Sequence, residues 1–158
     1  MNTLPHSLNP VSTAFLEEAI TDLSLVRILL VDDFVDWQRS VSDHLQQDRR
    51  FRVIAVASDG LQAVQTAQEL QPDLILLDIG LPHLNGIAAA RQIRDVSPSS
   101  KILFLTQELE PAVAQAALSS GGDGYVVKSS AAQDLIPAIE AVMLGKIFVS
   151  PRLTDRDT

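Results

Sequence analysis

Five polar residues of this 158-residue chain stand at or just past the ends of short apolar runs, where they could act together. They are Asp32, Asp33, Asp78, Thr106 and Lys128. Three carboxylates brought close together raise one another's pKa, so a fold that gathers them also needs a cation beside them. Lys128 and a divalent metal ion are the two candidates. Because the set contains only oxygen ligands, with no cysteine or histidine, it indicates Mg²⁺ rather than Zn²⁺.

Phosphoryl transfer is a reaction that uses such a set. It needs a nucleophile, a metal ion that neutralises phosphate oxygens, and a fixed cation and hydroxyl that stabilise the transferred group. Asp78 is the best candidate for the nucleophile, because it ends the most apolar run and a carboxylate can form an aspartyl phosphate. Asp32 and Asp33 would then hold the metal. Lys128 would contact the phosphoryl group, and the Thr106 hydroxyl would donate a hydrogen bond to it.

The elements that must position these residues are five strands alternating with five helices. The apolar runs are short and several are rich in β-branched residues, as in strands buried on both faces. They lie at residues 26–31, 51–57, 74–77, 102–105 and 125–127. Between them, apolar residues recur with helical spacing, for example at Leu61, Val64, Ala67 and Leu70. The alternation predicts a doubly wound α/β fold with a parallel sheet, in which ligands bind beyond the carboxyl ends of the strands.

Turn and cap residues agree with these boundaries. Asp59-Gly60 is predicted to open the second helix, and Pro72 to end it. Asn85 is predicted to cap the third helix. Pro137 falls inside the fifth helix, which we expect to survive with a bend.

Composition and charge narrow the class of protein. The net charge of −8 argues against a nucleic-acid-binding surface, because phosphate contacts need basic side chains. With 46% hydrophobic residues the chain is not disordered, and without cysteine it has no disulfide scaffold or thiol nucleophile. No apolar run reaches the ~18 residues of a membrane helix. The first ten residues do not resemble a secretory signal, so we expect a cytoplasmic protein.

The chain divides into three parts. Residues 1–25 are predicted to be an N-terminal extension, either a tail or a short helix that Ser12 would cap. Residues 26–146 form the domain, and Gly145 is predicted to end its last helix. Residues 147–158 are predicted to be a C-terminal linker.

Four motifs, in order and on the expected elements, carry a resemblance to a known family. They are Val31-Asp32-Asp33, then Leu77-Asp78-Ile79-Gly80-Leu81-Pro82 with Asn85-Gly86, then Leu105-Thr106, then Gly124-Tyr125-Val126-Val127-Lys128. From about residue 26 to 144 the chain resembles the receiver domain of bacterial two-component response regulators. The resemblance implies a flavodoxin-like, five-stranded parallel sheet in the order 2-1-3-4-5 with five helices.

The resemblance also implies a role for each matching residue. Asp78 would accept a phosphoryl group from a phosphohistidine of a sensor histidine kinase. Asp33 would ligate Mg²⁺ directly, Asp32 mainly through water, and Gly80 through its backbone carbonyl. Lys128 would pair with the phosphoryl group.

A conformational switch is implied at the neighbouring strands. Thr106 would move toward the phosphate, and Tyr125 would rotate inward behind it. This motion would reshape the face made by the fourth helix near 113–118, the fifth strand, and the fifth helix near 133–142, where a partner or a second copy would dock. Gln107 is larger than the residue usual in the family and could restrict access to the phosphate. The resemblance therefore does not predict how long the phosphoryl group persists.

The end of the chain resembles the junction between a receiver and the helix-turn-helix domain of transcriptional regulators. The likeness is carried by Lys128-Ser129-Ser130, Val149-Ser150-Pro151 and Leu153-Thr154-Asp155-Arg156-Asp157. We therefore expect an output in transcription, with DNA bound by a missing C-terminal effector and not by this chain itself.

Two other functions on a similar sheet are alternatives. A Mg²⁺-dependent phosphatase also uses an aspartyl nucleophile, but such enzymes place two acids two residues apart after the first strand, whereas Asp32 and Asp33 are adjacent. A flavodoxin-like FMN carrier needs a hydroxyl- and glycine-rich phosphate loop at that place. We expect a signalling domain that catalyses only its own phosphorylation and dephosphorylation, with the phosphatase as the main alternative.

Overall fold

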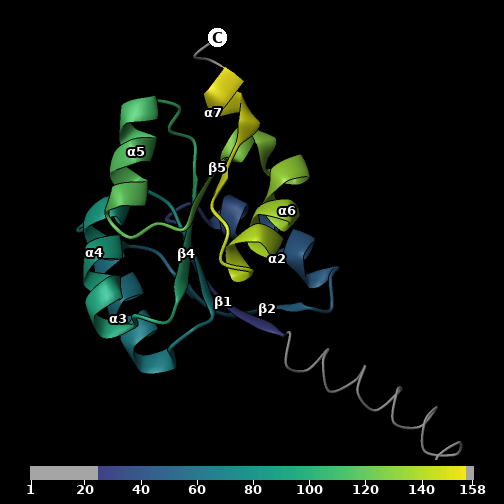
Figure 1. The fold of residues 1–158 in the computed structure, drawn as a ribbon. Coiled ribbons are helices and arrows are strands. Elements are labelled where there is room, and N and C mark those ends of the chain that lie inside the picture. Colours follow the sequence, from purple (N-terminus) through teal and green to yellow (C-terminus); the bar gives the residue numbers. More distant parts are fainter. Residues whose placement is uncertain (1–24, 156–158) are drawn as a thin grey trace, which may run out of the picture.

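The computed structural model describes residues 25–155, which form a parallel sheet flanked by helices (Figure 1). The strands are β1 (Val26–Val31), β2 (Phe51–Ala57), β3 (Leu74–Leu77), β4 (Lys101–Thr106), β5 (Gly124–Val127) and β6 (Phe148–Val149). Their order in the sheet is β2-β1-β3-β4-β5-β6, and all neighbours are parallel. The helices are α2 (Val35–Gln46), α3 (Gly60–Leu70), α4 (Gly86–Val96), α5 (Pro111–Ser119), η1 (Lys128–Ser130), α6 (Ala131–Met143) and α7 (Pro151–Asp155). The predicted flavodoxin-like α/β architecture is confirmed.

The predicted count of five strands and five helices is wrong. Within the described residues the structure adds β6 and α7, both in the stretch 147–158 that was expected to be a linker. A two-residue strand is too short to show a periodic pattern in the sequence. Pro151 is typical of linkers, yet it stands at the first position of α7, where a helix tolerates proline.

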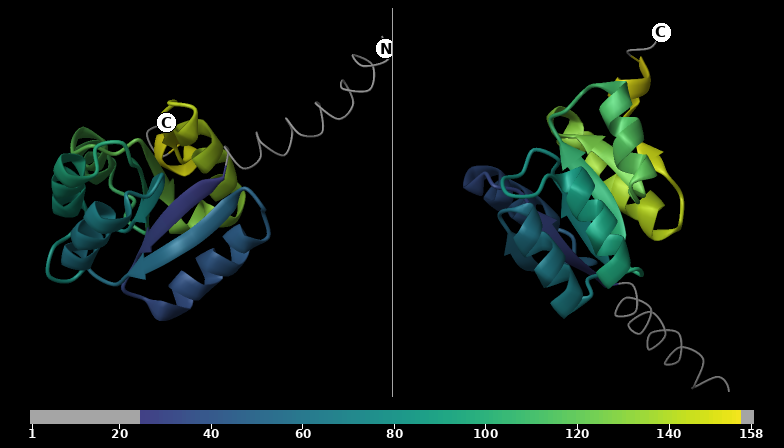
Figure 2. Two further views of the ribbon diagram at one scale, coloured as in Figure 1. Left: turned by 90° about the horizontal axis from the view of Figure 1, so that it is seen from below. Right: turned by 90° about the vertical axis from the view of Figure 1, so that its left-hand side faces the viewer.

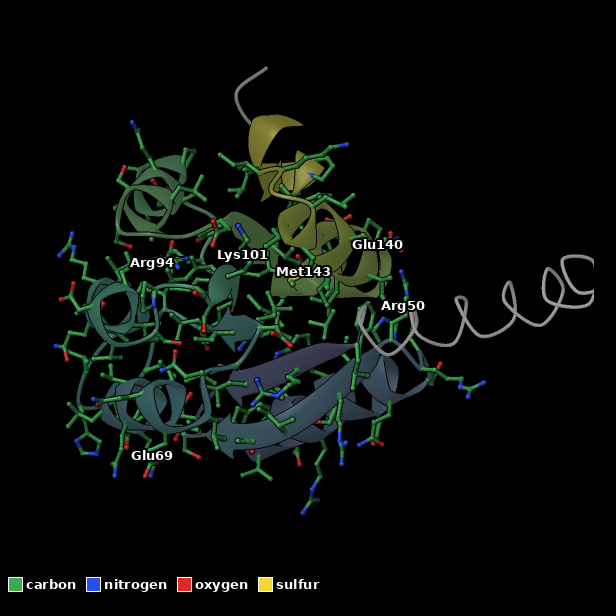
Figure 3. The ribbon with its side chains drawn as sticks, turned by 60° about the horizontal axis from the view of Figure 1, so that its bottom comes forward. Arg50, Glu69, Arg94, Lys101, Glu140 and Met143 are labelled. Atoms are coloured by element: carbon green, nitrogen blue, oxygen red, sulfur yellow. The ribbon has the colours of Figure 1, made fainter. Side chains whose placement is uncertain are left out.

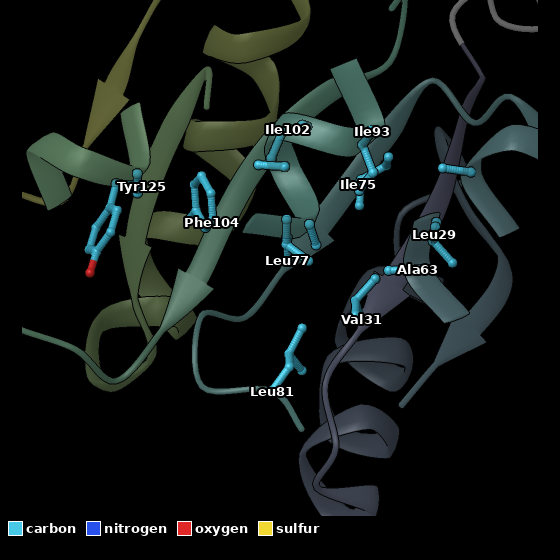
Figure 4. Packing of buried hydrophobic residues seen from close by; sticks show 14 of the residues in the cluster. Leu29, Val31, Ala63, Ile75, Leu77, Leu81, Ile93, Ile102, Phe104 and Tyr125 are labelled. Atoms are coloured by element: carbon cyan, nitrogen blue, oxygen red, sulfur yellow. The ribbon is translucent and has the colours of Figure 1, made fainter. Parts of the chain in front are cut away.

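Helices cover both faces of the sheet, which explains the continuous apolar runs. The helices α3, α4 and α5 lie along one face, and α2 and α6 lie along the other (Figures 1 and 2). All four residues of β3 are buried. Leu77 and Phe104 belong to the cluster beneath α3, α4 and α5, which also contains the ring of Tyr125 (Figure 4). The strands that carry the polar residues are therefore held rigidly from both sides.

Several predicted helix ends are confirmed. The side-chain oxygens of Asp59 and Asn85 cap α3 and α4 by accepting hydrogen bonds from main-chain N–H groups three residues on. Gln71 ends α3 in the left-handed conformation, with φ of 47°. Pro137 lies inside α6, and the helix continues through it.

Two arginines tie loops to helices at the amino ends of the strands. Arg50 pairs with Asp48 at 2.7 Å and with Glu140 of α6 at 2.9 Å (Figure 3). Arg94 of α4 pairs with Asp123, just before β5, at 2.6 Å. Partly exposed ion pairs of this kind contribute only about 0–1 kcal/mol each, so their main effect is to fix where the loops lie.

The expectation for residues 1–25 falls, apart from Leu25, outside the described residues. Within residues 25–155, no helix combines the length and the apolar character needed to cross a membrane.

The loop between β3 and α4 leaves no room for a side chain at Gly86. A Cβ there would lie 1.9 Å from the main-chain oxygen of Asp78, whereas a Cβ at Gly80 meets nothing within 4 Å. We predict that Gly86→Ala lowers the free energy of unfolding by about 1–3 kcal/mol, because the backbone must shift. Gly80→Ala is the matched control and should stay within about 0.5 kcal/mol of the wild type. Urea unfolding measures both, and equal effects would contradict the prediction.

Candidate functional site

The carboxyl ends of β1, β3, β4 and β5 surround a cavity of about 380 Å³. Its lining contains all five polar residues that the sequence analysis singled out, together with their neighbours. The lining residues are Asp32, Asp33, Phe34, Asp78, Ile79, Gly80, Thr106, Gln107, Glu108 and Lys128. The strand order therefore brings together residues that lie up to 96 positions apart in the chain, between Asp32 and Lys128.

Lys128 bridges two buried carboxylates at the centre of this site. Its Nζ lies 2.6 Å from Oδ2 of Asp32 and 3.0 Å from Oδ2 of Asp78. Asp32 is 1% exposed and Asp78 is 7% exposed. The lysine ammonium therefore supplies the cation that the sequence analysis expected beside the carboxylates.

Main-chain groups hold the second oxygen of each buried carboxylate. Oδ1 of Asp32 accepts a hydrogen bond from the N–H of Phe34 at 2.9 Å, and Oδ1 of Asp78 accepts one from the N–H of Ile79 at 2.7 Å. Each carboxylate is thus fixed on one side by its own loop and on the other side by Lys128.

Burial sets the protonation behaviour of the pair. Burial raises the pKa of Asp32, and the hydrogen bonds from Lys128 and Phe34 offset this only in part. Burial opposes the charged form of Lys128 as well, but the hydrogen bond to Asp32 and the charge of Asp78 outweigh it and raise the lysine pKa. Lys128 therefore stays protonated at neutral pH.

The three acids also form a group that fits a metal ion. One carboxylate oxygen from each of Asp32, Asp33 and Asp78 lies within 4.8 Å of the others. Asp33 is the exposed member of this group, whereas Asp32 and Asp78 are buried. All-oxygen donors of this kind suit a hard cation such as Mg²⁺. Gly80 lines the same cavity, as its predicted place in the metal site requires.

Of the two predicted switch residues, Thr106 lines the cavity and Tyr125 lies outside its lining. Thr106 is buried and lines the cavity. Tyr125 stands outside the lining and is fully buried, with its hydroxyl donating to the carbonyl of Glu108 at 2.9 Å (Figure 4). Burial, with the nearby charges of Glu108 and Asp78, raises the pKa of Tyr125 well above its ordinary value. The ring is thus already buried in this structure, and its rotation on phosphorylation stays a prediction.

Two residues of α2, Gln38 and Trp37, contact the site from outside the lining of the cavity. Gln38 donates a hydrogen bond from Nε2 to the main-chain oxygen of Asp32 and so supports the acidic loop. The ring of Trp37 lies 5.2 Å from Nζ of Lys128, measured to its centroid, as in a cation–π contact. The contact of Trp37 depends on how α2 packs beside Lys128, and that of Gln38 on a main-chain acceptor, neither of which periodicity reveals.

Comparison with known proteins decides the family. The family model described as the response regulator receiver domain matches residues 28–140. The chain belongs to the response regulator receiver domain family. Among solved structures, this receiver domain is similar to a two-component response regulator of the LuxR family from Aurantimonas, with 34% identity, a TM-score of 0.79, and coverage of 82% of this chain and 93% of that one.

Curated relatives of this receiver domain include a transcriptional regulatory protein and a response regulator protein. The transcriptional regulatory protein LnrK of Bacillus subtilis is 33% identical over 82% of this chain and 59% of its own length. The response regulator protein VraR of Staphylococcus aureus is 30% identical over 81% of this chain and 61% of its own length. The chain therefore spans about three fifths of the length of these relatives. The matches favour a receiver over the alternative of a phosphatase.

Because the pKa of Asp32 is raised, the free energy of unfolding should depend on pH through this residue. Folded Asp32 keeps its proton to a higher pH than the unfolded chain does, so its contribution to stability is lost as pH rises from 3.8 through the folded pKa. We predict that Asp32→Asn, which resembles the protonated acid, stabilises the metal-free protein relative to the wild type, increasingly as pH rises from 3.8 through the folded pKa. Lys128 keeps Asp78 as a partner in this variant.

Urea unfolding of both proteins across this pH range measures the difference. Asp43→Asn, at an exposed acid of α2, is the control and should show no such trend. A difference between Asp32→Asn and the wild type that stays constant with pH would contradict the prediction.

Proposed function

We propose that this receiver domain accepts a phosphoryl group on Asp78 from a phosphohistidine of a sensor histidine kinase and passes the change to a transcriptional output. The observation that carries the proposal is the placement of Lys128, which contacts Asp78 inside a cavity large enough for a phosphoryl group. The family and the names of the curated relatives support it. The domain catalyses its own phosphorylation and dephosphorylation and turns over no other substrate.

The residues divide the work of the transfer among them. A carboxylate oxygen of Asp78 attacks phosphorus, and the bond from phosphorus to the imidazole nitrogen of the donor breaks, with the electron pair leaving on nitrogen. Lys128 already contacts Oδ2 of Asp78 and is placed to neutralise the incoming phosphoryl oxygens. Asp32, Asp33 and Asp78 would hold Mg²⁺, together with the carbonyl of Gly80. When bound, the ion supplies further positive charge against the phosphoryl oxygens.

The switch follows from strand pairing. Thr106 of β4 pairs with Val127 of β5, two residues from Tyr125. A phosphoryl oxygen on Asp78 would accept a hydrogen bond from the Thr106 hydroxyl and pull the end of β4. Because Tyr125 donates to Glu108 in the loop after β4, its ring and that loop would respond together.

The responding face comprises α5, β5 and α6, where we place the docking of a partner or of a second copy in a homodimer. In the structure, β6 pairs with the outer edge of β5. A docking partner would therefore meet α5, α6 and the segment that carries β6, and not β5 alone. Binding of DNA by an effector domain, as in transcriptional regulators of this family, is the output that we propose for the complete regulator.

Labelling with a small phosphodonor tests the proposal. With acetyl phosphate and Mg²⁺ we expect incorporation of one phosphoryl group into the wild type and none into Asp78→Asn, which lacks the nucleophile. Asp95→Asn, at an exposed acid on α4, should be labelled like the wild type. Intact-protein mass spectrometry measures the incorporation, and equal labelling of Asp78→Asn would contradict the assignment.

Metal binding has an optical readout. Trp37 is the only tryptophan and lies beside Lys128, so Mg²⁺ entering the acidic group should change its fluorescence. We predict that Asp33→Asn weakens Mg²⁺ binding at least roughly tenfold, since even the partners of metal ligands matter on that scale. Asp36→Asn, at an exposed neighbour, should titrate like the wild type. An unchanged affinity in Asp33→Asn would remove this residue from the metal site.

A further inference from the structure

The segment after α6 is built into the sheet beside the site. In register, Phe148 of β6 lies beside Gly124 and Val149 beside Tyr125. The N–H of Ser150 then donates to the carbonyl of Tyr125 at 2.9 Å. A Cβ at Gly124 would lie only 3.1 Å from the carbonyl oxygen of Phe148, so the bare backbone there suits the close approach of β6.

The side chain of Ser150 continues this pairing beyond the end of β6. It is fully buried, and its Oγ accepts a hydrogen bond from the N–H of Val127 at 3.0 Å. The same hydroxyl donates to Oδ2 of Asp134, in the first turn of α6, at 2.9 Å. One hydroxyl thus joins the C-terminal segment to β5 and to α6.

The segment holds the chain on both sides of Lys128. Ser150 bonds the residue before Lys128, which is Val127. Arg152 bonds the residue after it, through a hydrogen bond from Nη1 to Oγ of Ser129 at 2.8 Å. The next residue, Leu153, is 4% exposed and belongs to the same buried cluster as Tyr125. These contacts anchor the segment firmly.

We infer that Ser150 is a positioning residue of the phosphoryl site, which sets the reach of Lys128 by fixing the end of β5. The inference rests on the proposed function of Asp78 and Lys128. Lys128 begins η1 directly after β5, and its Nζ must reach back to Asp32 and Asp78. A shift of Val127 therefore moves the lysine ammonium relative to the carboxylates, while the carboxylates themselves stay fixed on β1 and β3.

The same arrangement connects the C-terminal segment to the reaction. Any force on residues 149–152 acts on Val127 and Ser129. It therefore also acts on Lys128, which lies between them in the chain. The segment that the sequence analysis reads as a linker is therefore a structural part of the phosphoryl site.

Three measurements on the full chain test the inference. For Ser150→Ala we expect a changed emission of Trp37 without phosphodonor, because Lys128 lies over that ring. We expect the rate constant for labelling by saturating acetyl phosphate to fall roughly tenfold, as misplaced catalytic groups do. We expect the Mg²⁺ dissociation constant to change less than about twofold, because Asp32, Asp33 and Asp78 are held by other strands.

Ser120→Ala is the matched control. Its hydroxyl is also buried, but it donates to the carbonyl of Ala117 at the end of α5 and not to a group of β5. This variant should match the wild type in all three measurements. Asp134→Ala, at a half-buried position, removes the acceptor that orients the Ser150 hydroxyl and should shift emission and rate in the same direction as Ser150→Ala. If Ser150→Ala does not fold, the measurements on Asp134→Ala test the inference in its place.

The outcomes separate this inference from the proposed function. Wild-type emission and labelling rate in both Ser150→Ala and Asp134→Ala would overturn the positioning role. A parallel loss of Mg²⁺ affinity and rate would overturn it too, since that pattern indicates general loosening of the site. If the wild type itself takes no label, the proposed function fails, and the Trp37 emission of the variants still decides whether Ser150 positions Lys128.

Discussion

The ion pairs of Lys128 with Asp32 and Asp78 determine the charge balance at the centre of the site. Two nearly buried carboxylates at one point of a sheet would repel each other, and burial further opposes their charge. The ammonium group of Lys128, at 2.6 and 3.0 Å from the two carboxylates, offsets that cost. The hydrogen bonds from the N–H groups of Phe34 and Ile79 stabilise the carboxylates further. The result is a site that keeps negative charge ready for a metal ion while holding a cation ready for phosphate.

The fold divides this site into two halves. Asp32, Asp33 and Asp78 stand at the ends of β1 and β3, in the rigid middle of the sheet. Thr106 and Lys128 stand at the ends of β4 and β5, toward the edge that β6 completes. The half that would hold the metal is thus separate from the half that would respond to phosphate. In the proposed switch, the responding half would change position together with α5 and the C-terminal segment while β1 and β3 stay in place.

The sequence predicts most of this site because its residues end apolar runs, and strand order brings such ends together. The parallel sheet and the caps at Asp59 and Asn85 follow from similarly local patterns, whereas the order of the first five strands was implied by the resemblance to receiver domains. Contacts made through the main chain leave no such pattern. The bond from Tyr125 to the carbonyl of Glu108 and the bond from Val127 to Ser150 depend on backbone positions. The strand β6 has too few residues to show a periodic pattern. The sequence therefore predicts a linker for residues 147–155, although Phe148 and Val149 belong to the sheet.

Chemical mapping of the modified residue tests the central claim most directly. Borohydride reduces an aspartyl phosphate to homoserine, so protein treated with acetyl phosphate and then with borohydride carries a permanent mark at the acceptor. Peptide mass spectrometry locates that mark. If Asp78 is the acceptor, homoserine forms at position 78 alone and only when Mg²⁺ is present. Homoserine at another acid, or its formation at position 78 without Mg²⁺, would contradict the proposed site.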